Sequence, residues 1–182
     1  MTHIDCGCQD MAGLTRRGFL SKVVLGAGVA MFAAMAPKVA FAAGHSDALL
    51  LSCMDYRLID DIVRYMDGRG LTNNYDHVIL AGASLGVLTE TNVAWGQTFW
   101  DHMDVALKLH HIRKVMVMDH RDCGAYKVFL GPDHAKDAAT EFDTHAAKLR
   151  QLQVLIKQKY PELEVELMLM GLDGSVEPVS AA

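Results

Sequence analysis

The sequence predicts an α/β fold with an open, mostly parallel sheet, and three observations support this prediction. Four short apolar runs have the pattern of buried strands, and they alternate with segments whose apolar residues recur at helical spacing. Such alternation favours parallel strands joined by right-handed crossovers. Polar residues of the kind that carry chemistry follow two of the runs, where an open α/β sheet places its functional sites. We expect the strand order 2-1-3-4, with helices on both faces.

The expected elements follow one another from residue 47 to residue 179. A helix that begins after Arg57 and ends near the glycines at 68 and 70 separates the first two strands. After the second strand, the small residues of 82–86 form a loop, and a longer helix over 90–110 follows with Thr89 as its N-cap. The expected strands are 47–52, 75–81, 114–118, 165–170 and a short edge strand over 175–179, and a last helix begins near 138 and ends before Pro161.

The first 42 residues have the pattern of an export signal. A twin-arginine motif at Arg16-Arg17 precedes an apolar run over 23–35 and a small-x-small cleavage site at 40–42. We therefore expect residues 1–42 to be a twin-arginine signal, residues 43–182 to form one folded domain, and the mature protein to be periplasmic. The alternative is a membrane anchor, but the run is short for a spanning helix and ends at Pro37.

Charge and cysteine content restrict the partners and the chemistry of this domain. Without the signal's four basic and two acidic residues, 13 basic and 20 acidic residues remain, a net charge near −7. We therefore expect no nucleic-acid partner, and contact with a membrane only during export. The domain keeps two cysteines, Cys53 and Cys123, which an oxidising compartment would favour as a disulfide. Because His120 stands three residues before Cys123, a Cys₂His metal site with an open fourth position is the favoured interpretation.

Two motifs resemble a known enzyme family. Cys53-x-Asp55-x-Arg57, followed by His120-x-x-Cys123-Gly124-Ala125, resembles the signature motifs of the β-class carbonic anhydrases, over about residues 48–171. The resemblance implies that Zn²⁺ is bound by Cys53, His120 and Cys123. It also implies that Asp55 and Arg57 form a catalytic pair, and that Asp55 becomes a fourth ligand if Arg57 releases it.

The resemblance implies a lyase that converts carbon dioxide reversibly to bicarbonate, because zinc lowers the pKa of a bound water from about 16 toward 7 and provides hydroxide. It also implies a homodimer or a larger homo-oligomer. The same hydroxide could instead hydrolyse COS or CS₂. A zinc-binding module without catalysis is a further alternative.

The sequence departs from the family at several positions near these motifs. In the stretch that ends the second strand only Ala81 and Gly82 match, and the expected substrate-binding residues are Gly82, Ala83 and Ser84. Asp119 replaces a glycine and is either an extra polar group in the site or a solvated strand end. The charges at 121 and 122 are expected to lie exposed in a loop.

Overall fold

The computed structural model describes residues 44–181, so the expected export signal lies outside the described residues. Within this range, no helix combines the length and the apolar character needed to cross a bilayer. The elements are β1 (Ala48–Ser52), α2 (Ile59–Gly68), β2 (Tyr75–Ile79), α3 (Ser84–Leu88), α4 (Val93–His110), β3 (Lys114–His120), α5 (Gly124–Leu130), the 3₁₀ helix η1 (Pro132–Ala135), α6 (Ala138–Lys159), β4 (Glu164–Met170) and β5 (Val176–Pro178).

The five strands form one sheet in the order β2-β1-β3-β4-β5, which confirms the expected order 2-1-3-4 and adds the edge strand. β1 to β4 are parallel, and β5 pairs with β4 in the antiparallel sense. Because β1 and β3 are central and adjacent, Ser52 at the end of β1 lies beside Met118 near the end of β3. The residues that follow these two strands therefore meet at one edge of the sheet.

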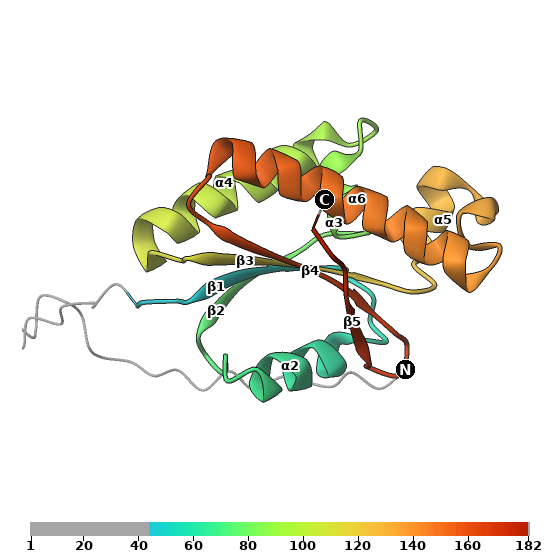
Figure 1. The fold of residues 1–182 in the computed structure, drawn as a ribbon. Helices are drawn as coiled ribbons and strands as arrows, with labels where there is room; N and C mark the ends of the chain where they lie inside the picture. Colours follow the sequence, from blue (N-terminus) through green and yellow to red (C-terminus); the bar gives the residue numbers. More distant parts are fainter. Residues whose placement is uncertain (1–43, 182) are drawn as a thin grey trace, which may run out of the picture. The chain divides into compact units, whose positions relative to one another are not determined.

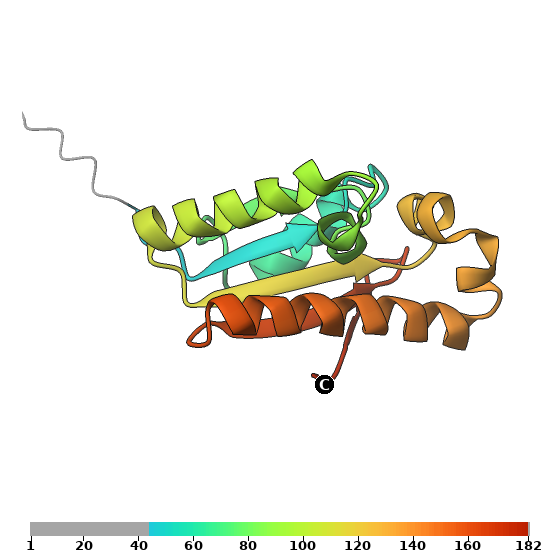
Figure 2. The same ribbon diagram turned by 90° about the horizontal axis from the view of Figure 1, so that it is seen from above.

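Helices cover both faces of the sheet, as expected. α2 lies on one face, and α4 and α6 lie on the other (Figures 1 and 2). Alternate residues of each strand point to opposite faces, so the side chains divide into two cores. The core under α2 is rich in methionine, with Met66, Met116, Met118, Met168 and Met170 all buried. The larger core under α4 and α6 contains mainly leucine, valine and aromatic residues.

The structure differs from the sequence prediction between residues 82 and 110. The expected loop and single long helix are instead two helices, α3 and α4, and the N-cap of α4 is Asn92 rather than Thr89. Gly86 lies inside α3 and not in a turn. A Cβ atom at this position would stand 2.5 Å from the carbonyl oxygen of Ala81, so the close approach of α3 to the preceding chain requires glycine.

The third strand is longer than the sequence predicts. β3 continues through Asp119 and His120, because these residues pair with Leu169 and Met170 of β4. The expectation of a solvated strand end at Asp119 is therefore wrong, since only 1% of this residue is exposed to solvent. The short helices α5 and η1 that follow were not predicted, because they are too short to produce a helical apolar pattern.

Candidate metal centre

Three side chains with metal-binding atoms converge at the carboxyl ends of β1 and β3. Cys53 follows β1, His120 is the last residue of β3, and Cys123 is the N-cap of α5. One ligand atom from each residue lies within 4.8 Å of the other two, and all three residues are buried. The two sulfur atoms are 3.9 Å apart and both cysteines are free thiols. The structure therefore has the convergent arrangement that the metal interpretation requires, and not the disulfide.

The geometry of these atoms fits a tetrahedral zinc ion. Two sulfurs, each about 2.3 Å from such an ion, stand about 3.8 Å apart, close to the 3.9 Å separation of the Sγ atoms. His120 Nδ1 donates a hydrogen bond to the carbonyl oxygen of Arg121, at 2.8 Å. This bond leaves a lone pair on Nε2, which is buried and has no hydrogen-bond partner among the described residues. The donor set therefore fits Zn²⁺.

The surroundings of the two sulfur atoms favour one thiolate, and a second thiolate only if a cation is bound between them. The Gly82 amide donates a hydrogen bond to Cys53 Sγ, at 3.3 Å. Hydrogen bonding from Cys123 lowers the pKa of Cys53, and the resulting thiolate in turn raises the pKa of Cys123. The backbone amides of Ala125 and Tyr126 oppose this rise. A second thiolate beside the first needs a cation between them, because two buried like charges repel.

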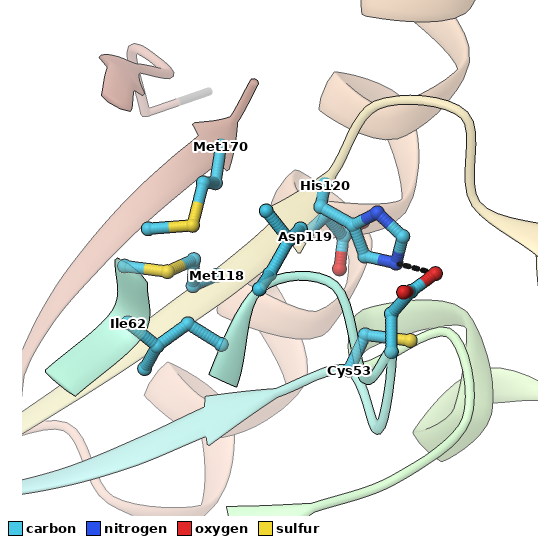
Figure 3. A pocket seen from close by; sticks show the side chains of 8 residues that line it. Cys53, Ile62, Met118, Asp119, His120 and Met170 are labelled. Carbon is cyan, nitrogen blue, oxygen red and sulfur yellow. Dashed lines mark ion pairs between the residues drawn. The ribbon is translucent and has the colours of Figure 1, made fainter. Parts of the chain in front are cut away.

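Asp55 lies beside this cluster but is held by Arg57. The guanidinium donates from Nε to Oδ1 at 2.9 Å and from Nη2 to Oδ2 at 2.8 Å, and the Arg57 amide donates to Oδ1 at 3.0 Å. The hydrogen bonds from the Arg57 side chain are the main reason that the pKa of Asp55 is lowered to about 2. Asp55 Oδ2 is 3.8 Å from His120 Nε2, the contact drawn as a dashed line in Figure 3. The carboxylate therefore stands next to the candidate ligands in an orientation fixed by Arg57.

Arg57 also binds the loop between the two later ligands. Its Nη1 donates to Asp122 Oδ2 at 2.8 Å, and its Nη2 donates to the Asp122 carbonyl oxygen at 3.0 Å. Asp122 has a φ of 54°, an uncommon backbone conformation for a residue with a side chain. Its amide donates to Glu141 Oε1, at 2.6 Å, and Arg121 pairs with Glu141. Arg121 and Asp122, expected as exposed loop charges, lie in a loop in which Asp122 is exposed and Arg121 is partly buried, and their contacts also fix the loop that carries Cys123.

Comparison with known proteins agrees with this geometry. A family model described as "Putative carbonic anhydrase" matches residues 43–180. The chain belongs to this carbonic anhydrase family. It is 41% identical over 135 residues to an uncharacterized protein of Rickettsia conorii, covering 74% of this chain and 73% of that one. A second uncharacterized protein, from Rickettsia bellii, is 38% identical over 135 residues, 74% of this chain and 82% of that one.

Solved structures show that the fold is that of the β-carbonic anhydrases. The β-carbonic anhydrase CafA of Aspergillus fumigatus matches with a TM-score of 0.52 and 16% identity, over 76% of this chain and 77% of that one. A structure from Sordaria macrospora, described as one of two tetrameric β-carbonic anhydrases, matches with a TM-score of 0.51 and 12% identity, over 76% and 82%. At these identities the likeness concerns the fold alone.

Two cavities border the candidate site of this carbonic anhydrase family member. The larger has a volume of about 390 Å³ and reaches Cys53 and Asp55. The remainder of its wall is mostly apolar, formed by Met54, Tyr56, Ala81, Trp95, Gly124, Ala125, Val128 and Phe129. The smaller, of about 10 Å³, lies between Cys53, Asp55 and His120 and the methionine-rich core (Figure 3). The larger cavity gives a small apolar molecule access to the cluster.

The expected substrate-binding stretch lies mainly behind this cavity. Ala81 lines the cavity, whereas Ala83 and Ser84 are fully buried. Gly82 reaches the site through its amide, which bonds to Cys53. The predicted roles of Gly82, Ala83 and Ser84 in substrate binding remain predictions. None of the three lines the larger cavity; Gly82 contacts the candidate ligand Cys53, and Ser84 contacts Asp119.

A buried cluster around Asp119 was not foreseen from the sequence. The carboxylate accepts hydrogen bonds from Ser84, Tyr126 and His145, and each of these residues is fully buried. Burial raises the pKa of Tyr126 well above its usual value, so its hydroxyl stays protonated and donates. An aspartate in place of the family's glycine was the only sequence signal for this cluster, and it did not identify the partners.

Proposed function

We propose that this protein binds Zn²⁺ through Cys53, His120 and Cys123 and catalyses the reversible hydration of carbon dioxide to bicarbonate. The observation that carries the proposal is the convergence of three buried ligand atoms within 4.8 Å, beside a carboxylate oriented by an arginine. Membership of the carbonic anhydrase family supports the same reaction.

Asp55, Arg57 and Gly82 each have a separate role in this proposed reaction. When bound, zinc supplies the Lewis acidity that makes water nucleophilic near neutral pH. Asp55 is ionised because its pKa is about 2, so Oδ2 can accept a hydrogen bond from the attacking water and direct its lone pair toward substrate. Arg57 holds both Asp55 oxygens and so keeps this carboxylate from turning toward the ligands. The backbone amide of Gly82 keeps the Cys53 sulfur in place.

The larger cavity suits an uncharged substrate. The part of its wall formed by residues 44–181 is mostly apolar and contains no lysine, arginine or histidine. Carbon dioxide has no net charge and enters such a surface without losing strong hydration. Bicarbonate is an anion and finds no cationic side chain in the wall to retain it. The lining therefore supports entry of CO₂ and departure of the charged product.

Stopped-flow measurement of CO₂ hydration tests this proposal. The zinc-loaded protein is compared with Cys123→Ser, and metal content is measured on both samples. We expect stoichiometric zinc and hydration well above the uncatalysed rate in the unaltered protein, and neither in the variant. A protein that purifies without metal and takes up no zinc would refute the site. A zinc-loaded protein without hydration activity would refute the reaction and leave the metal site standing.

Hydrolysis of COS or CS₂ is the second candidate. The observation that favours it is the size and apolar lining of the larger cavity, about 390 Å³, which has room for uncharged molecules larger than CO₂. Release of hydrogen sulfide from either compound, measured beside CO₂ hydration on the same sample, separates the two. A kcat/KM for COS or CS₂ above that for CO₂ would assign the sulfur compound as the substrate.

Export and self-association complete the proposal. The twin-arginine pattern supports delivery of a folded, metal-loaded protein to the periplasm. Exposed apolar side chains beside the larger cavity, Met54, Tyr56 and Val128, support a homo-oligomer. A reporter fused to residues 1–42, with Arg16→Lys and Arg17→Lys as control, tests export, and light scattering during size-exclusion chromatography tests the oligomer.

A further inference from the structure

We propose that Asp119 is a positioning residue that holds in place the backbone amides facing both ligand sulfurs. The inference rests on the zinc site proposed above and adds a residue that is not one of the three candidate ligands. The Asp119 carboxylate is bound by Ser84, Tyr126 and His145, and its side chain points to the opposite side of the strand from that of His120, because successive side chains of a strand point to opposite faces. Its effect on the metal must therefore pass through its hydrogen-bond partners.

The Asp119 carboxylate accepts four hydrogen bonds from three elements. Oδ1 accepts from the Ser84 amide at 3.0 Å. Oδ2 accepts from the Ser84 hydroxyl at 2.7 Å, from the Tyr126 hydroxyl at 2.5 Å and from His145 Nδ1 at 3.0 Å. Only 1% of Asp119 is exposed to solvent. Hydrogen bonds in such a dry cluster are strong and hold their members rigidly.

One branch of the cluster leads to Cys53. Ser84 is the first residue of α3, and both its amide and its hydroxyl bind Asp119. Gly82, two residues earlier, donates its amide to Cys53 Sγ. The residue between them, Ala83, has a φ of 40°, which a residue with a side chain rarely adopts. The anchoring of Ser84 by Asp119 offsets this unfavourable turn and thereby keeps the Gly82 amide directed at the sulfur.

The other branch leads to Cys123. Tyr126 lies in the first turn of α5, whose N-cap is Cys123, so its backbone amide is one of the helix-start amides beside Cys123. Its hydroxyl binds Asp119, and its ring packs against His145 of α6 with the ring centroids 3.8 Å apart. Asp119 therefore fixes the orientation of the first turn of α5 from outside the metal site.

The expected consequence is weaker zinc binding when the cluster is cut. Groups outside the ligand set that orient the ligands change metal affinity by about 10- to 100-fold when removed. Tyr126→Phe removes only the hydroxyl and keeps the ring, and we expect the zinc Kd to rise about 10-fold. Asp119→Asn removes the negative charge and replaces one of the two acceptor oxygens by an NH₂ group, and we expect the zinc Kd to rise nearer to 100-fold.

Tyr160→Phe is the matched control. Tyr160 is also mostly buried, and its hydroxyl also donates to an aspartate, Asp104, but it lies away from the candidate ligands. Zinc Kd is measured by competition with a chromophoric chelator, and the stability of each metal-free protein is measured by urea unfolding. In the Co²⁺-substituted proteins, the sulfur-to-cobalt charge-transfer absorption reports on the environment of the thiolates directly.

We expect Tyr126→Phe to shift the charge-transfer band and raise the zinc Kd, and Tyr160→Phe to leave both unchanged within twofold. If Asp119→Asn does not fold, Tyr126→Phe and Ser84→Ala decide the question. The inference is overturned if folded Tyr126→Phe and Ser84→Ala both keep the zinc Kd and the absorption of the unaltered protein. Failure of the unaltered protein to bind zinc is a different result, since it refutes the proposed function and removes the basis of the inference with it.

Discussion

Replacing Asp55 by asparagine should lower kcat/KM for CO₂ hydration by about 10- to 150-fold while zinc stays bound. Asp55 is not one of the three clustered ligands, but its Oδ2 lies 3.8 Å from His120 Nε2, the atom that would bind the metal, so Asp55 could accept a hydrogen bond from a water that zinc would activate there. A hydrogen bond to a charged group contributes about 1.5 to 3 kcal/mol. At about 1.4 kcal/mol for each factor of ten, this range corresponds to the predicted loss in rate.

Stopped-flow hydration and metal analysis on the same samples measure this effect. Asp143→Asn is the matched control, because it removes an exposed carboxylate on α6, away from the candidate ligands. We expect the control to keep both zinc and rate. An Asp55→Asn variant with unchanged kcat/KM would refute the role of this carboxylate in orienting water. Loss of zinc together with the rate would instead make Asp55 a ligand, contrary to its pairing with Arg57.

Three further changes test the site and the fold. Cys123→Ser should lose zinc together with several kcal/mol of unfolding free energy, since metal binding and folding are coupled; unchanged zinc content by metal analysis would remove Cys123 from the ligand set. Arg69 lowers the pKa of Glu166 below its ordinary 4.5, so the pair stabilises the fold above that pH and this stabilisation is lost as the pH falls through the lowered value. Arg69→Met should therefore cost about 1 kcal/mol at pH 7, and urea unfolding at a series of pH values should show the difference from the unaltered protein shrinking below pH 4.5; a constant difference would contradict the linkage. Gly86→Ala should cost about 1 to 3 kcal/mol in urea unfolding, because its Cβ would stand 2.5 Å from the Ala81 carbonyl oxygen, and a stable variant would show that α3 can move.

The sequence was sufficient for the sheet and for the convergence of the candidate ligands. Both follow from local patterns. Apolar runs define the strands, and their alternation with helices makes the strands parallel. Right-handed crossovers then leave only a few possible strand orders. Once β1 and β3 are neighbours, Cys53 and His120 must lie at the same edge. The strand order could therefore be predicted correctly, although the sequence does not show directly which strands pair.

The sequence was insufficient wherever a contact joins distant residues without a repeating pattern. Asp119 is 35 residues from Ser84 and 26 from His145, and Arg57 is 65 residues from Asp122. No periodicity marks such pairs. The break between α3 and α4 was missed for a different reason, because α3 has only five residues and is too short to produce a helical apolar pattern of its own.

The amino-acid sequence by itself determined the strand-helix order, the parallel sheet and the meeting of two cysteines and a histidine at one of its edges. Those features depend on which residues are apolar and on the handedness of the chain, and both are local properties. Only the tertiary structure decided that Arg57 holds both Asp55 and the loop of Asp122, and that Asp119 is a buried acceptor rather than a solvated charge. Hydrogen bonds of this kind depend on distance and direction between side chains, which exist only after the sheet and the helices have packed.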